Sequence, residues 1–400
     1  MRLALPGGTF TVLLLLLLGA QPIATDLYLP ALPAITRDLG PASTSLTVFA
    51  LAFGISQLFS GPLADRWGRR PLLLAGLALY ALGALGATLA GSIAALAGWR
   101  AVQGVAMAAI LICARAAVRD RYSALEGPRV MALGLSGLGV VALLAPLLGA
   151  VMTQYASWRW ALACMTAYAL VVLVWCAWRF PETRPATPPK GAQGGAREVL
   201  RNANFWAWSS LTAATYGGIF CFLLLSPMVY VERLGLSPLA YGWIPASGSL
   251  VYTFSTAWCR HLLHRRTAVR CVQLGAGFSL AGAALQLAGA VWWPDRMVPL
   301  LLGHWVYVVG HGFHQPCSQA GAVSDLPQAA GRAVAWSGFI TMAVAFALGQ
   351  AVAHFSHGID GVGQGVLTGT WPVALPMALA GLCIWLITRC WLARVQLATQ

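Results

Sequence analysis

Charged side chains are scarce in this sequence of 400 residues. They make up 9% of the chain, against 59% hydrophobic residues, and only 11 residues are acidic. Soluble domains carry charge at about a quarter of their positions. A soluble chain of this length would also have to bury most of its apolar surface in one core, and single cores stop growing at about this size. The composition therefore excludes an ordinary soluble protein and favours one whose apolar surface faces lipid.

Several motifs that indicate other kinds of chemistry are also missing. The 9 cysteines include no CxxC pair and are odd in number, so the sequence predicts neither disulfides nor a metal site. It contains no GxGxxG motif, no Walker loop and no nucleophile–base pair, so we expect no cofactor and no enzyme activity. A net charge of +14 would indicate a nucleic-acid partner for a soluble protein. In an apolar chain the placement of these charges matters more, and we expect no such partner.

Long apolar stretches are abundant instead. A membrane-spanning helix needs about 20 mainly apolar residues, and the chain contains twelve stretches of this kind. The first follows Arg2 and imitates a secretory signal peptide, but its apolar run continues toward Leu32, so we interpret it as a membrane helix. An all-α protein with twelve transmembrane helices is predicted, over approximate spans 9–33, 44–63, 71–91, 93–117, 130–153, 158–178, 205–230, 240–259, 270–291, 298–322, 331–355 and 371–392.

The basic residues predict an orientation. Of the 25 Lys and Arg residues, all but five fall in the loops on the same side as the two termini. The positive-inside rule places such loops in the cytoplasm. We therefore expect a multi-pass protein of the bacterial inner membrane with both termini cytoplasmic. The five exceptions are Arg37, Arg100, Arg159, Arg233 and Arg296.

One polar segment, residues 181–203, divides the chain. It contains Pro185, Pro188, Pro189 and several glycines, a composition typical of a flexible linker. The linker would join a six-helix bundle over residues 1–180 to a second bundle over residues 204–400. Two such bundles suggest a transporter that rocks its halves around a site at the membrane midplane, and we expect it to act as a monomer.

A charged motif lies between the second and third predicted spans. The turn must be tight, so Gly61 and Gly68 at its ends each have a backbone reason. Asp65 can accept hydrogen bonds from a nearby helix N-terminus, and the arginines can face anionic lipid or an acidic partner such as Asp120. The alternative is a basic loop that only sets orientation. The motif comprises Gly61, Asp65, Arg66, Gly68, Arg69 and Arg70.

This pattern, GxxxDRxGRR, resembles the signature loop of the major facilitator superfamily, in which the loop is a cytoplasmic latch between the two halves. Other segments resemble the bicyclomycin and chloramphenicol-resistance branch of drug:proton antiporters. The likeness is dense over residues 22–206 and implies the major facilitator fold. It also implies Pro146 and Gly149 as the antiporter-motif helix. The matching segments are 26–33 (DLYLPALP), 99–104 (WRAVQG), 118–122 (VRDRY), 145–150 (APLLGA), 180–184 (FPETR) and 204–206 (NFW).

Two charged residues are candidates for proton coupling. Asp26 lies near the outer end of the first span, where a carboxylate is costly unless it faces water, a partner or a substrate path. It either carries a proton or caps the helix before Pro30. Arg100 lies within the fourth span, and the resemblance implies that it faces a central cavity and modulates the proton affinity of Asp26. It could instead hold the fourth span to its neighbours, and Gln103 could share either role.

Three histidines share one face of the tenth span. His304, His311 and His314 are spaced at i, i+7 and i+10, so they could bind a metal, relay protons or form a polar stripe. Aromatic side chains in other spans could line a drug pocket, although many such residues face lipid. The residues expected to bind substrate are Tyr28, Phe53, Gln103, Tyr216, Phe220 and His311.

The predicted function is proton-coupled export of drug-like small molecules. Asp26 is the only acid within the predicted spans, and moving one charge through 100 mV costs about 2.3 kcal/mol. We therefore expect neutral, phenicol-type substrates rather than dications. Two alternatives remain at this stage. One is a carrier of a sugar, nucleoside or amino acid, and the other is a membrane enzyme that uses the histidines of the tenth span.

Overall fold

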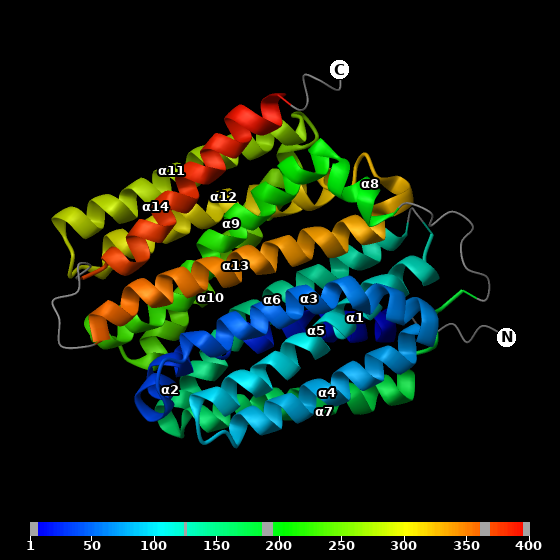
Figure 1. Ribbon diagram of the computed structural model, residues 1–400, viewed down its shortest axis with the longest axis horizontal. Helices are drawn as coiled ribbons and strands as arrows, with labels where there is room; N and C mark the ends of the chain where they lie inside the picture. Colours follow the sequence, from blue (N-terminus) through cyan, green and yellow to red (C-terminus); the bar gives the residue numbers. More distant parts are fainter. Residues whose placement is uncertain (1–6, 124–125, 186–194, 361–368, 395–400) are drawn as a thin grey trace. The chain divides into compact units, whose positions relative to one another are not determined.

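The computed structural model describes residues 7–123, 126–185, 195–360 and 369–394, and this part of the chain contains helices and no strand (Figure 1). Twelve of the described helices have 16 residues or more. They are α1 (Gly7–Thr25), α3 (Ser43–Trp67), α4 (Arg69–Thr88), α5 (Ile93–Arg121), α6 (Gly127–Tyr155), α7 (Trp158–Arg179), α9 (Ala203–Pro227), α10 (Pro238–Leu262), α11 (Ala268–Trp292), α12 (Met297–Gly321), α13 (Ala330–Asp360) and α14 (Trp371–Leu386).

Ten stretches of the described chain are long and apolar enough to cross a membrane. The two long helices outside this set are α10 and α12, which form at the predicted spans 240–259 and 298–322. Both are less apolar than the other long helices in the ten stretches, because α10 carries several serines and threonines and α12 carries three histidines.

The first predicted span, 9–33, is interrupted. The helix α1 ends at Thr25, and a 3₁₀ turn (Leu29–Ala31) and the short helix α2 (Leu32–Leu39) follow it. Pro30 and Pro33 explain the interruption, because proline lacks the N–H that a continuing helix would use. Asp26 therefore lies in the turn after α1 rather than inside one continuous helix.

The chain divides into two compact units, Met1–Lys190 and Gly191–Gln400. This boundary falls inside the segment 181–203 expected to be a linker, of which residues 186–194 lie outside the described part. The remainder of that segment is not all irregular, because residues Ala196–Arg201 form the short helix α8.

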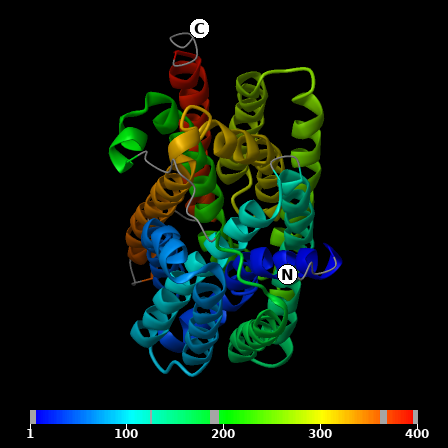
Figure 2. The same ribbon diagram turned by 90° about the vertical axis from the view of Figure 1, so that its right-hand side faces the viewer.

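The two units repeat one pattern of helix packing. In the first unit α3 packs on α5, α5 on α4, α4 on α7 and α1 on α6. In the second unit α10 packs on α12, α12 on α11, α11 on α14 and α9 on α13, which are the same positions in chain order. Figure 2 views α3, α4 and α5 of the first unit (blue to cyan) nearly along their axes. Each unit is therefore one copy of a six-helix motif, as in transporters built from repeats.

Candidate functional site

A buried arginine forms the polar centre of the first unit. Arg100, on α5, is 0% exposed, and its guanidinium lies 4.6 Å from the ring centre of Tyr28 and 4.4 Å from that of Phe49. Its Nη1 donates to Gln103 Oε1 at 2.9 Å, and its Nη2 donates to the carbonyl of Ala24 at 2.9 Å. A cation buried among aromatic faces is held by cation–π contacts and by these two hydrogen bonds.

Asp26 lies close to this centre along the chain but does not pair with it. Its Oδ1 accepts a hydrogen bond from Thr25 Oγ1 at 2.7 Å, and its backbone N–H donates to Pro22 at 2.7 Å. Arg100 instead contacts the carbonyl two residues before Asp26. The family resemblance implies that Arg100 modulates the proton affinity of Asp26, and the structure brings the two segments together without an ion pair between these two side chains.

The helix α6 reaches the same turn through a glycine. A Cβ atom at Gly149 would overlap the carbonyl oxygen of Leu27, so only glycine allows this approach between α6 and the chain that carries Asp26. Pro146, one turn earlier, is buried inside α6. The two residues expected on the antiporter-motif helix therefore lie on the helix that packs against the Asp26 turn.

The other predicted binding residues of the first unit are packed inside it. Phe53 is 5% exposed and stacks on Phe49 with 6.3 Å between ring centres. The hydroxyl of Tyr28 shares a 2.7 Å hydrogen bond with Ser45, and Gln103 is 0% exposed. Tyr28, Phe53 and Gln103 therefore surround Arg100 either directly or through Phe49.

The two glycines of the charged motif, Gly61 and Gly68, have different structural roles. Gly68 has φ +101°, and a Cβ there would overlap the Glu182 carboxylate, so glycine is required. The expectation for Gly61 is wrong, because Gly61 lies inside α3 and a Cβ there would have nothing within 4 Å. The tight turn begins only at Gly68, since α3 continues to Trp67.

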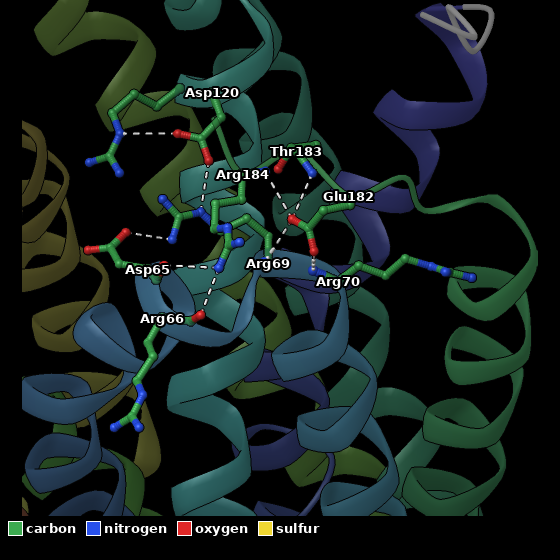
Figure 3. A network of polar contacts seen from close by, with 9 residues as sticks. Asp65, Arg66, Arg69, Arg70, Asp120, Glu182, Thr183 and Arg184 are labelled. Atoms are coloured by element: carbon green, nitrogen blue, oxygen red, sulfur yellow. Dashed lines mark hydrogen bonds and ion pairs between the residues drawn. The ribbon is translucent and has the colours of Figure 1, made fainter. Parts of the chain in front are cut away.

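Arg69 connects three elements of the first unit at this turn (Figure 3). Its Nη1 lies 2.6 Å from Asp65 Oδ1, at the end of α3, and its Nε lies 2.8 Å from Asp120 Oδ2, near the end of α5. The side chains of Arg69 and Asp120 are 4% and 5% exposed, whereas that of Asp65 is 69% exposed. The Arg69–Asp120 pair is therefore the buried part of the network, and a buried pair of this kind is costly to break on one side only.

Glu182 completes the network and was not predicted from the sequence. Its Oε1 accepts the backbone N–H of Arg69 at 2.9 Å, and its Oε2 accepts that of Arg70 at 3.2 Å (Figure 3). These are the first N–H groups of α4, so the carboxylate that caps this helix is Glu182 and not Asp65 as expected. Arg184, two residues on, donates to the carbonyl of Arg66 at 2.7 Å and ties the segment 181–185 to the end of α3.

The electrostatics of Glu182 follow from these contacts. Partial burial raises the pKa of its carboxyl, but hydrogen bonds from the backbone N–H groups of Arg184, Arg69, Arg70 and Thr183 outweigh burial and lower the pKa below its ordinary value of 4.5. The ionised carboxylate is therefore the form that the network stabilises. The only sequence signal was the FPETR segment, which gave no hint that its acid reaches α4.

The second unit holds the remaining predicted residues. Thr215 Oγ1, on α9, lies 3.0 Å from His311 Nδ1 and 3.3 Å from His314 Nδ1, and His314 Nε2 lies 3.2 Å from the carbonyl of Val272. His311 also packs against Tyr252, with 5.3 Å between ring centres. His311, which was expected to bind substrate, is therefore connected to His314 through the hydroxyl of Thr215. Nothing in the sequence singles out this threonine.

His304 lies apart from this pair. Its ring stacks on Phe222 of α9 at 3.5 Å, with the two planes 8° apart. His304 is the eighth residue of α12 and Arg100 the eighth of α5, and these are the fourth long helices of their units.

Within the described chain, no group of three His, Cys, Asp or Glu side chains is arranged to hold a metal ion. The metal hypothesis for the three histidines therefore finds no support.

Two predicted aromatic residues also lie on α9. Tyr216 and Phe220 stack with 6.2 Å between ring centres. Phe220 is 2% exposed, and Tyr216 is part-buried. The structure brings these two rings together one helical turn apart on a single helix, beside Thr215.

Comparison with known proteins agrees with this fold. The family described as Major Facilitator Superfamily matches residues 14–350. The chain is 30% identical to the chloramphenicol resistance protein of Pseudomonas aeruginosa over 320 residues, which cover 78% of this chain and 76% of that protein. It is 29% identical to multidrug resistance protein D of Escherichia coli (strain K12), over 95% of this chain and 94% of that protein.

A solved structure of a D-xylose-proton symporter has a TM-score of 0.70 at 15% identity, and the match covers 95% of this chain and 98% of that chain. At this identity the likeness concerns the fold alone. Helical repeats, apolar spans and the sequence match together define a multi-pass membrane protein of a transporter class. The chain belongs to the major facilitator superfamily.

Proposed function

We propose that this protein exports drug-like small molecules across the bacterial inner membrane in exchange for protons. The observation that carries the proposal is the match to a chloramphenicol resistance protein at 30% identity over 78% of this chain. A second relative over nearly the full length is a multidrug resistance protein. The substrate class is neutral and apolar, of the phenicol type, because the first unit surrounds its polar centre with Tyr28, Phe49 and Phe53 and not with further acids.

The proposed coupling acid is Asp26, and the proposed modulator is Arg100. Asp26 is part-buried in a turn at the end of α1, while Arg100 is fully buried and hydrogen-bonded to that same segment. A movement that brings the guanidinium to the carboxylate would favour the ionised acid, and one that separates them would favour the protonated acid. Proton release and uptake would then follow the conformational change.

The proposed gating element is the network around Arg69, which we call the α3–α4 latch (Asp65, Arg66, Arg69, Arg70, Asp120 and Glu182). Its buried pair, Arg69–Asp120, holds the start of α4 to the end of α5, while the exposed Asp65 and Arg66 at the end of α3 remain available to other partners. In the proposed cycle the bundles 1–180 and 204–400 rock as a monomer, with both termini in the cytoplasm, and the latch stabilises one of the two states.

Transport into everted membrane vesicles tests the proposal. Everted vesicles from cells that express the protein should accumulate labelled chloramphenicol when the lumen is acidic. Collapse of the gradient with an uncoupler should release it. Vesicles without the protein are the control. Accumulation that is equal in both preparations, for chloramphenicol and for florfenicol, would contradict the proposal.

A further inference from the structure

The hydroxyl of Thr215 has an unusual pair of partners. Other buried threonines of the second unit, such as Thr212, Thr341 and Thr388, donate to the carbonyl four residues earlier in their own helix. Thr215 is 0% exposed, and its two hydrogen bonds are both to imidazole nitrogens of α12. A threonine in a helix ordinarily satisfies itself on its own backbone, so this contact needs a separate explanation.

The partners of His314 determine where its hydrogen lies. The carbonyl of Val272 can only accept, so Nε2 of His314 carries the hydrogen and donates it across 3.2 Å. In the neutral ring Nδ1 is then an acceptor, which takes the hydroxyl hydrogen of Thr215. Because that hydroxyl has only one hydrogen, Nδ1 of His311 must donate to Thr215. The hydrogen bonds therefore run in one direction, from His311 through Thr215 to His314.

The two ends of this chain of hydrogen bonds differ in access. His314 is 0% exposed and is anchored to α11 through Val272. His311 is part-buried, and its second nitrogen, Nε2, has no hydrogen-bond partner in the part of the chain that the structure describes. The anchored end of this chain of hydrogen bonds is therefore His314, and the end with an unpartnered nitrogen is His311.

We propose that His311, Thr215 and His314 form a proton relay that holds one proton, shared between two imidazoles, inside the second unit. A proton that arrives forms a bond to Nε2 of His311. The Nδ1–H bond of His311 then breaks as its proton passes to Oγ1 of Thr215, and the hydroxyl proton of Thr215 passes to Nδ1 of His314. The result is a neutral His311 and a cationic His314, with no further reactant.

The surroundings of the two imidazoles disfavour a second charge. The elements packed against α12 are α9, α10 and α11, and no carboxylate or basic side chain of the described residues contacts either imidazole. A second proton would place two cations on one hydroxyl in a buried site, so the pair titrates as a unit. The titratable side chains around it are His304, Tyr307 and Cys317 on α12, Tyr216 on α9, Tyr252 and Cys259 on α10 and Cys271 on α11.

Hydrogen–deuterium exchange at the C2 position of each histidine tests the relay without any drug, because this exchange reports the protonation of a single imidazole. The purified full-length protein is measured by mass spectrometry between pH 4 and 9. We expect His311 and His314 to inflect at the same pH in the wild type. In Thr215→Val the two profiles should separate. In Thr215→Ser, which keeps the hydroxyl, they should stay together.

Thr212→Val is the matched control. It removes a buried hydroxyl from the same helix, one that bonds to Trp208 and Ser318 and to no histidine, so the shared profile should survive. If Thr215→Val does not fold, His314→Gln takes its place, because a glutamine amide can keep the bond to Val272 but cannot take up a proton. In that variant the profile of His311 should move. Separate wild-type profiles, an absence of exchange at His314, or profiles that are unchanged in the broken variants would overturn the relay.

The use of the relay in transport rests on the proposed function, and a second readout separates the two ideas. In proteoliposomes, Thr215→Val should slow proton-driven chloramphenicol uptake by about tenfold or more, since positioned proton transfer contributes about 10²-fold or more. Drug exchange without a proton gradient should stay near wild type. A wild-type protein that transports no drug would contradict the proposed function, while the histidine exchange would still decide the relay. Normal proton-driven uptake in Thr215→Val would remove the relay from the coupling path.

Discussion

Arg100 donates a hydrogen bond to the carbonyl of Ala24 across 2.9 Å, two residues before Asp26. The contact fixes the guanidinium against the backbone of the α1 end rather than against the acid. A buried cation that bonds to a carbonyl and an amide can exchange these for a carboxylate at little cost in hydrogen bonds. We propose that this arrangement is one of two states of the contact, because coupling of proton binding to movement requires two states.

The first prediction concerns the two hydrogen bonds that the Arg100 guanidinium donates. Lysine at this position keeps the charge but lacks the planar guanidinium, whose two separate nitrogens donate to Gln103 and Ala24. A hydrogen bond to a charged group contributes about 1.5–3 kcal/mol, so Arg100→Lys should reduce proton-driven uptake by about tenfold or more. Arg159→Lys is the control, because Arg159 makes a single hydrogen bond to Ala90 that a lysine can keep. Equal uptake in the two variants would argue against a special role for Arg100.

The second prediction concerns Glu182 and pH. The folded protein holds the pKa of this carboxyl below its ordinary value of 4.5. Its contribution to stability is therefore complete above about pH 4.5 and is lost as the pH falls through the lower folded value. Thermal unfolding of the purified protein in detergent should show this loss in the wild type and a shallower acid dependence in Glu182→Gln. Identical acid dependence in both proteins would show that the cap is not ionised in the folded state.

The third prediction separates the two glycines of the latch motif. Gly68→Ala combines a strained φ with an overlap on Glu182 and should lower the free energy of unfolding by about 1–3 kcal/mol or more. Gly61→Ala lies in a helix with open space at its Cβ and should be neutral or stabilise by up to about 1 kcal/mol. Chemical unfolding of both variants in detergent measures the difference. A Gly61→Ala protein that is as unstable as Gly68→Ala would contradict this assignment.

These glycines also illustrate what the sequence could and could not predict. Apolar stretches of suitable length located the long helices, because the bilayer imposes their length and composition. The motif pattern pointed correctly to a turn, but it could not tell that α3 continues past Gly61 and turns only at Gly68. That distinction depends on where the last helical hydrogen bond forms, which a glycine-rich motif does not encode.

The candidate site likewise contains some residues that the sequence could predict and others that it could not. Asp26 and Arg100 could be selected because charge is rare in apolar spans, and rarity is visible in a sequence. The role of Glu182 and the bridge at Thr215 could not be selected, because each depends on a contact about a hundred residues away along the chain. Polar residues outside the spans, and threonines within them, are too common for composition alone to single one out.

The fourth prediction concerns the contact between α6 and the Asp26 turn. Gly149→Ala places a methyl group on the carbonyl of Leu27 and should displace the turn, with a loss of uptake of about tenfold or more, since overpacking typically costs about 1–3 kcal/mol. Gly98→Ala in α5 is the control, because its Cβ would meet nothing within 4 Å. Uptake measured at equal protein level compares the two. Full activity in Gly149→Ala would mean that the turn can move away without loss of function.

The central claim is that Asp26 couples drug export to protons, and its most direct test is gradient-driven uptake by Asp26→Asn. Everted vesicles are loaded with an acidic lumen, and labelled chloramphenicol accumulation is compared between this variant and the wild type at equal protein level. We predict accumulation in the wild type and none above background in the variant, because asparagine cannot carry the proton. Undiminished, gradient-driven accumulation in Asp26→Asn would contradict the claim and leave the histidine relay of the second unit as the site to test next.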